Sequence, residues 1–186
     1  MIRNAFDSIG VVQELLKTIC QLAEVRETVN QKKEITDTSL LDRAMKIKAE
    51  DYAARHMRAL EDIAKGQKTT KTKDGQLPPL FLPYYMVRSI LTIDFNDIVK
   101  GIKRETLEAE IKKYHHRSAD VRPSDMSNLL YNLSKMQSDK GISPPIVDFD
   151  RVNRELKIID STFYFFLRNI DRNQILTSLV SPIEEK

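Results

Sequence analysis

Residues 145–160 read Pro145-Ile146-Val147-Asp148-Phe149-Asp150-Arg151-Val152-Asn153-Arg154-Glu155-Leu156-Lys157-Ile158-Ile159-Asp160, and this stretch decides the fold. Two short apolar runs, residues 146–149 and 156–159, flank a polar centre at residues 150–154. Short runs rich in Ile, Val and Phe on either side of a polar turn are typical of a β-hairpin. We therefore predict two antiparallel strands joined by a turn at residues 150–154.

Two helices are predicted just before this hairpin. Residues 105–114 carry Leu107 and Ile111 four positions apart, which places them on one helical face. The next helix, residues 125–137, is expected to bury five apolar residues: Met126, Leu129, Leu130, Leu133 and Met136. This spacing leaves Ser127, Asn128, Tyr131, Asn132 and Lys135 on its outer face. Gly141 is expected to end the helix, and a helix pair followed by a hairpin is the winged helix-turn-helix arrangement.

The rest of the chain is predicted to be mainly helical. Apolar residues recur at intervals of three and four over residues 8–23, and a second helix is expected from Ser39 to about Lys65. Residues 67–76 have no apolar side chain, so residues 67–79 are expected to be a flexible linker. The predicted fold is thus mainly α with a small β-hairpin wing. It comprises a helical unit at 1–66 and a winged-helix domain at 80–186, with an aromatic helix near residues 163–167 packed under the wing.

Composition says little about partners. The 186 residues carry a formal net charge of only +3, which a nucleic-acid-binding protein often exceeds, although a local basic patch is sufficient for binding. A single cysteine, Cys20, cannot form an internal disulfide, which favours a reducing compartment. The apolar stretches are too short to span a bilayer. We therefore expect a cytoplasmic protein that has no membrane partner.

The quoted hairpin, together with Phe163-Tyr164-Phe165-Phe166-Leu167-Arg168, resembles the winged helix that closes many prokaryotic AAA+ and STAND-type ATPases. In that group a wing ending in Asp, here Asp160, precedes an aromatic helix ending in Arg, here Arg168. The opening Phe6-Asp7-Ser8-Ile9-Gly10-Val11-Val12-Gln13-Glu14-Leu15-Leu16 is similar to the helical lid that follows an AAA+ nucleotide-binding core. The resemblance implies a lid-like unit at 1–66 and either the C-terminal part of a longer ATPase or a free-standing relative.

Catalysis is not expected from these residues. The sequence has no Gly-x-x-x-x-Gly-Lys-Ser/Thr loop, and Gln13 stands where many AAA+ lids carry an arginine that reaches the nucleotide. The pair His115-His116 lacks a third ligand at a suitable spacing, so both histidines are expected to be surface residues at a helix end. We therefore predict a non-catalytic chain without a cofactor or a metal.

Two functions remain open. The first is duplex DNA binding, with the 125–137 helix in the major groove and the wing on the backbone. The candidate residues are His115, His116, Arg117, Arg122, Ser124, Ser127, Asn128, Asn132, Lys135, Arg151 and Arg154. Five aspartates among the same positions would repel phosphate: Asp120, Asp125, Asp139, Asp148 and Asp150. The alternative is an interaction or regulatory module that packs on an ATPase core or a partner subunit. An unbroken basic face would favour DNA, whereas arginines paired with carboxylates would favour a protein partner.

Overall fold

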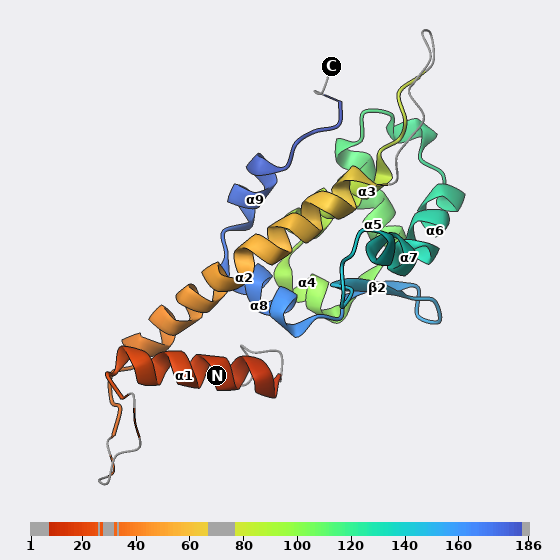
Figure 1. Ribbon diagram of the computed structural model, residues 1–186. Helices are drawn as coiled ribbons and strands as arrows, with labels where there is room; N and C mark the ends of the chain where they lie inside the picture. The colour runs from red at the N-terminus through yellow and green to blue at the C-terminus, as the bar shows by residue number, and fades with distance from the viewer. Residues whose placement is uncertain (1–7, 26, 28–31, 33, 67–76, 184–186) are drawn as a thin grey trace. The chain divides into compact units, whose positions relative to one another are not determined.

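The computed structural model of the chain describes residues 8–25, 27, 32, 34–66 and 77–183. Its contacts divide the chain into two compact units, residues 1–56 with 161–170 and residues 57–160 with 171–186. The division passes through the long helix α2 (Ser39–Lys65), labelled with the other elements in Figure 1. Most of the predicted linker (67–76) and the first residues of the lid-like opening lie outside the described residues.

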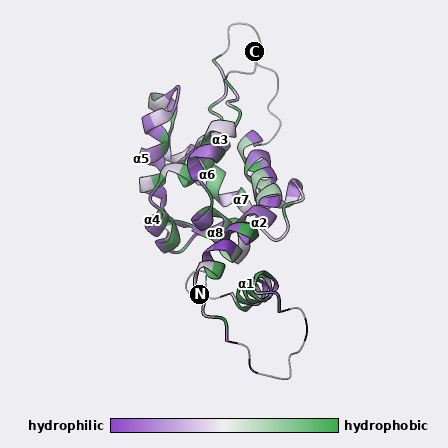
Figure 2. Cartoon of the chain, turned by 90° about the vertical axis from the view of Figure 1, so that its left-hand side faces the viewer, coloured by the Kyte–Doolittle hydropathy of each residue, from purple (hydrophilic) through white to green (hydrophobic). Residues whose placement is uncertain are grey.

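The first unit contains α1 (Ile9–Leu22), the N-terminal part of α2, and α8 (Ser161–Asn169). Ser8 caps α1 by accepting a hydrogen bond from the Val11 backbone N–H. Asp37 accepts from the Ser39 N–H at 2.9 Å and so marks the start of α2. Both α1 and α2 carry hydrophobic and hydrophilic residues around their axes (Figure 2). Their buried sides form one cluster of Val11, Leu15, Ile19, Leu40, Ala44, Ala49 and Phe165.

The aromatic helix was predicted correctly as an element. In the first unit, α8 contributes Phe165 to the α1–α2 cluster. The hairpin belongs to the other unit, so the packing of this helix under it stays a prediction. Two other rings of α8, Phe163 and Phe166, have centroids 5.3 and 5.4 Å from the ring of His56 on α2. His56 is fully buried, and its Nε2 lies 3.0 Å from the Thr162 hydroxyl. The apolar spacing of α2 does not indicate that His56, a histidine within a charged helix, is part of this core.

The second unit is built around a three-stranded antiparallel sheet of β1 (Ile102–Lys103), β2 (Val147–Asp150) and β3 (Glu155–Ile158). The strand order is β1-β3-β2, with Phe149 opposite Leu156 in the hairpin and Ile102 opposite Leu156 on the other side. The predicted hairpin is therefore confirmed. Alternate residues of β2 and β3 are buried, so one face of the sheet belongs to the core.

Helices surround this sheet in the order α3 (Leu82–Thr92), α4 (Phe95–Lys100), α5 (Arg104–Tyr114), the short 3₁₀ helix η2 (Ser118–Asp120), α6 (Pro123–Tyr131), α7 (Leu133–Asp139) and, after the hairpin, α9 (Arg172–Ser178). The contacts bring α7 and α6 against β2, α4 against β3, and α3 against both α5 and α9. The mainly helical fold class with a small sheet is thus confirmed.

The single helix predicted over 125–137 is two helices that meet at Asn132. The Asn132 side-chain Nδ2 donates to the Asn128 carbonyl at 2.8 Å, in competition with the Asn132 backbone N–H, which reaches the same oxygen at 3.3 Å. Leu129, expected in the core, is only half-buried. Gly141 ends α7 as predicted, with a φ of +72° and an N–H bonded to the Ser138 carbonyl.

A buried glutamine joins α7 to the hairpin. Gln137 Nε2 donates to the Val147 carbonyl at 2.7 Å, and its Oε1 accepts from the Ile146 N–H at 2.9 Å. The side chain is completely shielded from solvent. These bonds satisfy backbone groups at the start of β2 that have no strand partner of their own, and they fix the hairpin on α7.

Candidate functional site

The turn of the hairpin is held by one carboxylate. Asp150 accepts from the backbone N–H groups of Val152 and Asn153, each at 3.0 Å, and from the Asn153 side chain at 2.8 Å. Lys157 Nζ lies 2.8 Å away on β3. These hydrogen bonds, the Asn153 N–H foremost, hold the pKa of the Asp150 carboxyl far below its ordinary range. The turn therefore presents its remaining side chains on a fixed backbone.

Two arginines extend from this turn. Arg151 donates to the Tyr131 carbonyl at 3.3 Å, and its guanidinium lies 5.1 Å from the centre of the Tyr131 ring on α6. Arg154 has a positive φ of 55° and is exposed. Among the described residues, neither arginine has a carboxylate within ion-pair distance. Val152, which lies between them in the sequence, is 91% exposed, so the hairpin tip combines two cations with one solvent-exposed apolar side chain.

A second residue that connects this turn to α6 is Arg104, which no motif in the sequence indicates. Its backbone N–H donates to the Arg154 carbonyl at 3.0 Å, and its Nη1 donates to Ser127 Oγ at 3.1 Å. Its Nη2 forms an ion pair with Glu105 at 2.9 Å. Ser127 also donates to the Pro123 carbonyl, so the hydroxyl predicted to face a ligand is already engaged within the protein.

The other basic candidates are paired with carboxylates three or four residues further along the chain. Arg117 Nε lies 2.7 Å from Asp120, and Arg122 Nε lies 3.1 Å from Asp125. Lys135 Nζ lies 2.6 Å from an Asp139 oxygen. The Arg122 hydrogen bond lowers the pKa of Asp125 below its usual value. These pairs neutralise much of the positive charge expected before and along the helix.

The histidine pair lies where α5 ends. His115 was expected at the surface but is buried, because its Nε2 bonds to the Leu80 carbonyl at 2.7 Å and its Nδ1 accepts from the Arg117 N–H at 2.8 Å. Burial lowers the pKa of His115 below its ordinary value. His116 is exposed, and its Nδ1 lies 3.0 Å from the Tyr85 hydroxyl. His115 is thus a structural residue that ties α5 to the segment before α3.

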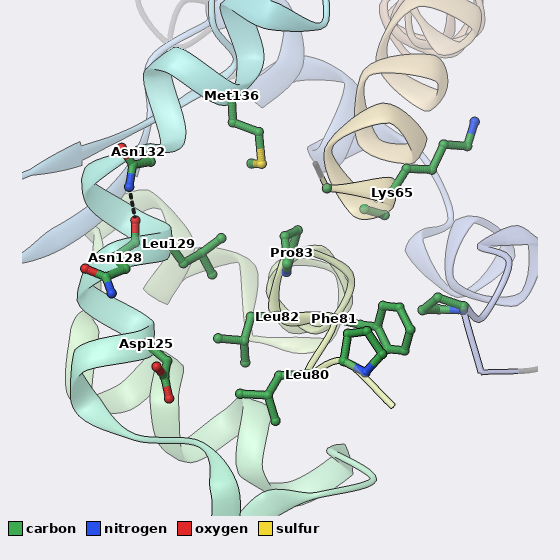
Figure 3. A pocket seen from close by; sticks show the side chains of 14 residues that line it. Lys65, Leu80, Phe81, Leu82, Pro83, Asp125, Asn128, Leu129, Asn132 and Met136 are labelled. Carbon is green, nitrogen blue, oxygen red and sulfur yellow. Dashed lines mark hydrogen bonds between the residues drawn. The ribbon is translucent and has the colours of Figure 1, made fainter. Parts of the chain in front are cut away.

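Part of the α6 outer face borders a pocket. Asn128 and Asn132, both exposed, line it together with the end of α2 and residues 79–83 (Figure 3). Its volume is about 530 Å³. Ser124, at the start of α6, is exposed and does not line the pocket.

Seven of the eleven predicted site residues fall into three groups. Arg151 and Arg154 form the hairpin tip, and Asn128 and Asn132 line the pocket. The histidines lie with Arg117 beside the segment that precedes α3. The other four, Arg122, Ser124, Ser127 and Lys135, lie at the start of α6, within it, or on α7. Because Arg117, Arg122 and Lys135 are paired with carboxylates, the candidates do not form one continuous basic face.

No arrangement of three His, Cys, Asp or Glu side chains suited to a metal ion occurs within the described ranges. In the same part of the chain, no helix has the length and apolar character that crossing a membrane requires. No family model matches the sequence, and no curated protein or solved structure matches it. The function must therefore be argued from the site itself.

Proposed function

We propose that the second unit is a winged helix that binds duplex DNA, with the hairpin as its main phosphate contact. The order of its elements supports this proposal: the strand β1 precedes α5, α6 and α7 follow, and the β2–β3 hairpin pairs with β1 in the order β1-β3-β2. In the proposed arrangement, the hairpin is the wing beside the helices that would face DNA.

The main support for the proposal is that the two hairpin arginines, Arg151 and Arg154, form no ion pair within the described residues. Both are exposed on a turn fixed by Asp150, and the charge of Arg154 acts on Glu105 only from a longer distance. A guanidinium in this state can bind phosphate without first breaking an ion pair. By contrast, Arg117 and Arg122 would have to leave their aspartates.

The remaining candidates are assigned smaller roles. Arg122 keeps 74% of its side chain exposed despite its aspartate partner, and Ser124 is exposed at the same end of α6. Both are proposed to contact the DNA backbone. The exposed side chains of α6 are proposed to contact the base edges. Most of the affinity is expected from contacts with phosphates, so the binding constant should fall steeply as the salt concentration rises.

The resemblance to prokaryotic AAA+ and STAND-type ATPases supports a wider proposal. In it, this chain is the non-catalytic C-terminal region of such an ATPase, and nucleotide hydrolysis takes place on a core that carries the P-loop. The chain itself contains no P-loop sequence. DNA binding by the wing would then place the ATPase on a duplex.

The test is fluorescence anisotropy of a labelled mixed-sequence duplex with the purified chain at salt concentrations from about 50 to 200 mM. The double variant Arg151→Ala/Arg154→Ala is expected to bind about tenfold or more weakly, with the slope of log K against log salt reduced by about two. The matched control, Arg43→Ala/Arg58→Ala, removes the same charge from the exposed face of α2 and should bind like the unmodified chain. Equal losses in both variants would show only a general charge effect, and no binding at about 50 mM salt would refute the proposal.

A second candidate function, a protein-interaction module, is favoured by a different observation. Arg117, Arg122 and Lys135 are each paired with a carboxylate, which suits a mixed-charge protein surface better than a phosphate-binding face. The five aspartates that would repel phosphate also have partners within the protein. Asp148 accepts from the Ser134 hydroxyl at 2.6 Å, and the other four form ion pairs with arginine or lysine side chains. The partner in this case is an ATPase core or another subunit.

A further inference from the structure

The pocket beside α6 has three walls, all within the second unit. The first is the end of α2 at Ala64, Lys65 and Gly66, and the second is the segment 79–83 that leads into α3. The third is formed by α6 and α7, which contribute Asn128, Asn132 and Met136 among others. Figure 3 shows side chains from all three walls around the same space.

The lining is mainly apolar. Its apolar side chains include Leu80, Phe81, Leu82, Pro83, Leu129 and Met136. The volume of about 530 Å³ lies within the range of roughly 300 to 1,000 Å³ that is usual for ligand sites. Such a space accepts one or two aliphatic side chains and a short length of backbone, but it is too small for a helix, whose diameter with side chains is about 10 to 12 Å.

Two amides one helical turn apart supply the polar part of the lining. Asn132 Nδ2 is occupied by the Asn128 carbonyl, which leaves Asn132 Oδ1 as an acceptor. Within the described residues, the Asn128 side-chain amide makes no hydrogen bond and offers both a donor and an acceptor. Residues four apart lie on one face of a helix. An extended peptide presents N–H and C=O groups along its edge, so its backbone matches this pair.

The pocket is lined by one carboxylate, Asp125, and one cation, Lys65, and the two differ in how closely they are paired. Asp125 is neutralised by Arg122, whose Nε and Nη2 lie 3.1 and 3.3 Å from its two oxygens. On the opposite wall, 68% of the Lys65 side chain is exposed, and its nearest carboxylate, that of Asp62, lies 3.7 Å away. An acidic group beside the bound segment would therefore meet an incompletely satisfied ammonium.

From these features we infer that the pocket binds an extended peptide segment of a partner protein, with an aliphatic side chain in the pocket and an acidic residue next to Lys65. This inference rests on the second candidate function and does not depend on DNA binding by the wing. It assigns Asn128 and Asn132 to the peptide backbone, and leaves the hairpin arginines for another ligand.

The test is an NMR titration of the ¹⁵N-labelled full chain with capped pentapeptides. One probe has a central leucine flanked by glutamates between terminal glycines; the second replaces leucine with alanine, and the third replaces the glutamates with lysines. The leucine–glutamate peptide is expected to shift the side-chain amide signals of Asn128 and Asn132 saturably, with a dissociation constant about fivefold or more below those of the other two. Shifts that do not saturate, or equal constants for all three peptides, would overturn the inference.

Variants of exposed residues test the polar contacts. Asn128→Ala, which keeps the Asn132 side-chain bond to the Asn128 carbonyl, should weaken the leucine–glutamate peptide about fivefold or more, followed through the Leu129 and Met136 signals. Lys65→Glu should reverse the preference, so that the lysine peptide binds more tightly than the glutamate peptide. The control Lys46→Glu makes the same charge change on an exposed residue of the first unit and should leave the order unchanged. An unchanged order in Lys65→Glu would contradict the assignment. If a DNA duplex shifts the same amide signals and the peptides do not, the pocket face binds DNA and the peptide inference is overturned.

Discussion

Arg104 on α5 donates a hydrogen bond from Nη1 to Ser127 Oγ on α6 at 3.1 Å, while its backbone N–H reaches the Arg154 carbonyl at the end of the hairpin turn. One residue thereby fixes both α6 and the hairpin against the start of α5. Only 20% of its side chain is exposed, so these bonds are partly shielded from solvent. The hairpin is thus positioned by a residue that is not itself at its tip.

The first prediction concerns the free energy of unfolding of Arg104→Ala. Loss of the charged hydrogen bonds to Ser127 and the Pro123 carbonyl should lower it by about 1 to 3 kcal/mol in urea denaturation. Ser127→Ala removes one acceptor of the Arg104 guanidinium and should lower the free energy of unfolding by less than Arg104→Ala does. The double variant should cost less than the sum of the two single variants, because they share one interaction. Strictly additive losses would contradict a direct coupling between Arg104 and Ser127.

The second prediction concerns the hairpin turn. Asp150→Asn should lower the melting temperature at pH 7, because an amide accepts the turn N–H groups and Lys157 less well than a carboxylate. The folded-state pKa of Asp150 is lower than its unfolded value, so its contribution is complete above the ordinary aspartate pKa of about 4 and is lost as the pH falls below it. The difference from the unmodified chain should therefore shrink in acid.

Calorimetry at pH 7 and at lower pH checks this second prediction. Asp139→Asn, which removes an exposed carboxylate from the end of α7, is the matched control and should have little effect at either pH. A difference between the unmodified chain and Asp150→Asn that stays constant down to about pH 2 would mean that the turn does not depend on the charge of Asp150.

The hairpin and most helices were predictable because their apolar spacing and turn residues agree locally. The apolar residues at 146–149 and 156–159 predict two strands. Ser8 and Gly141 mark helix ends, because a capping hydrogen bond and a positive φ involve only residues close by in the sequence. The break at Asn132 was missed because the apolar pattern continues through it, whereas the break arises from a side-chain bond to the Asn128 carbonyl.

Long-range placement was not predictable from spacing. His115 and His56 are polar residues whose burial depends on partners far along the chain, the Leu80 carbonyl and Thr162. Arg104 has no motif around it, and its role appears only when α5, α6 and the wing are brought together. The pairing of Arg122 with Asp125 had a visible signal, the three-residue spacing at the start of a helix.

The third prediction is a loss of stability in mild acid that depends on His115. Its folded-state pKa is lowered, chiefly by burial, so the unfolded chain binds the proton more readily. The contribution of neutral His115 to the free energy of unfolding should therefore be fully present above the ordinary histidine pKa of about 6.5 and should decrease as the pH drops below it. Protonation at Nδ1 would also place a donor against the Arg117 N–H. His115→Gln should be less stable at pH 7 but should lose less stability between pH 7 and 5.

Urea denaturation at the two pH values, with NMR titration of the imidazole signals, checks this third prediction. The pKa of His116 is lowered too, chiefly by the partial desolvation of its ring although the residue as a whole is exposed, so His116→Gln serves as the control that separates the two rings. A His115 midpoint at or above about 6.5 would show that its ring is not held neutral by the fold.

The fourth prediction concerns Gln137, whose buried amide joins α7 to the first residues of the hairpin. Gln137→Leu keeps a similar volume but leaves the Ile146 N–H and the Val147 carbonyl without their side-chain partner. Buried unsatisfied groups cost about 1 to 3 kcal/mol each, so the free energy of unfolding should fall by about 2 to 5 kcal/mol. Gln174→Leu, an exposed change on α9, should stay within about 0.5 kcal/mol of the unmodified chain. Hydrogen exchange should quicken first at the β2–β3 amides in Gln137→Leu. A large loss of stability without faster exchange in these strands would mean that Gln137 supports the α7 core rather than the wing.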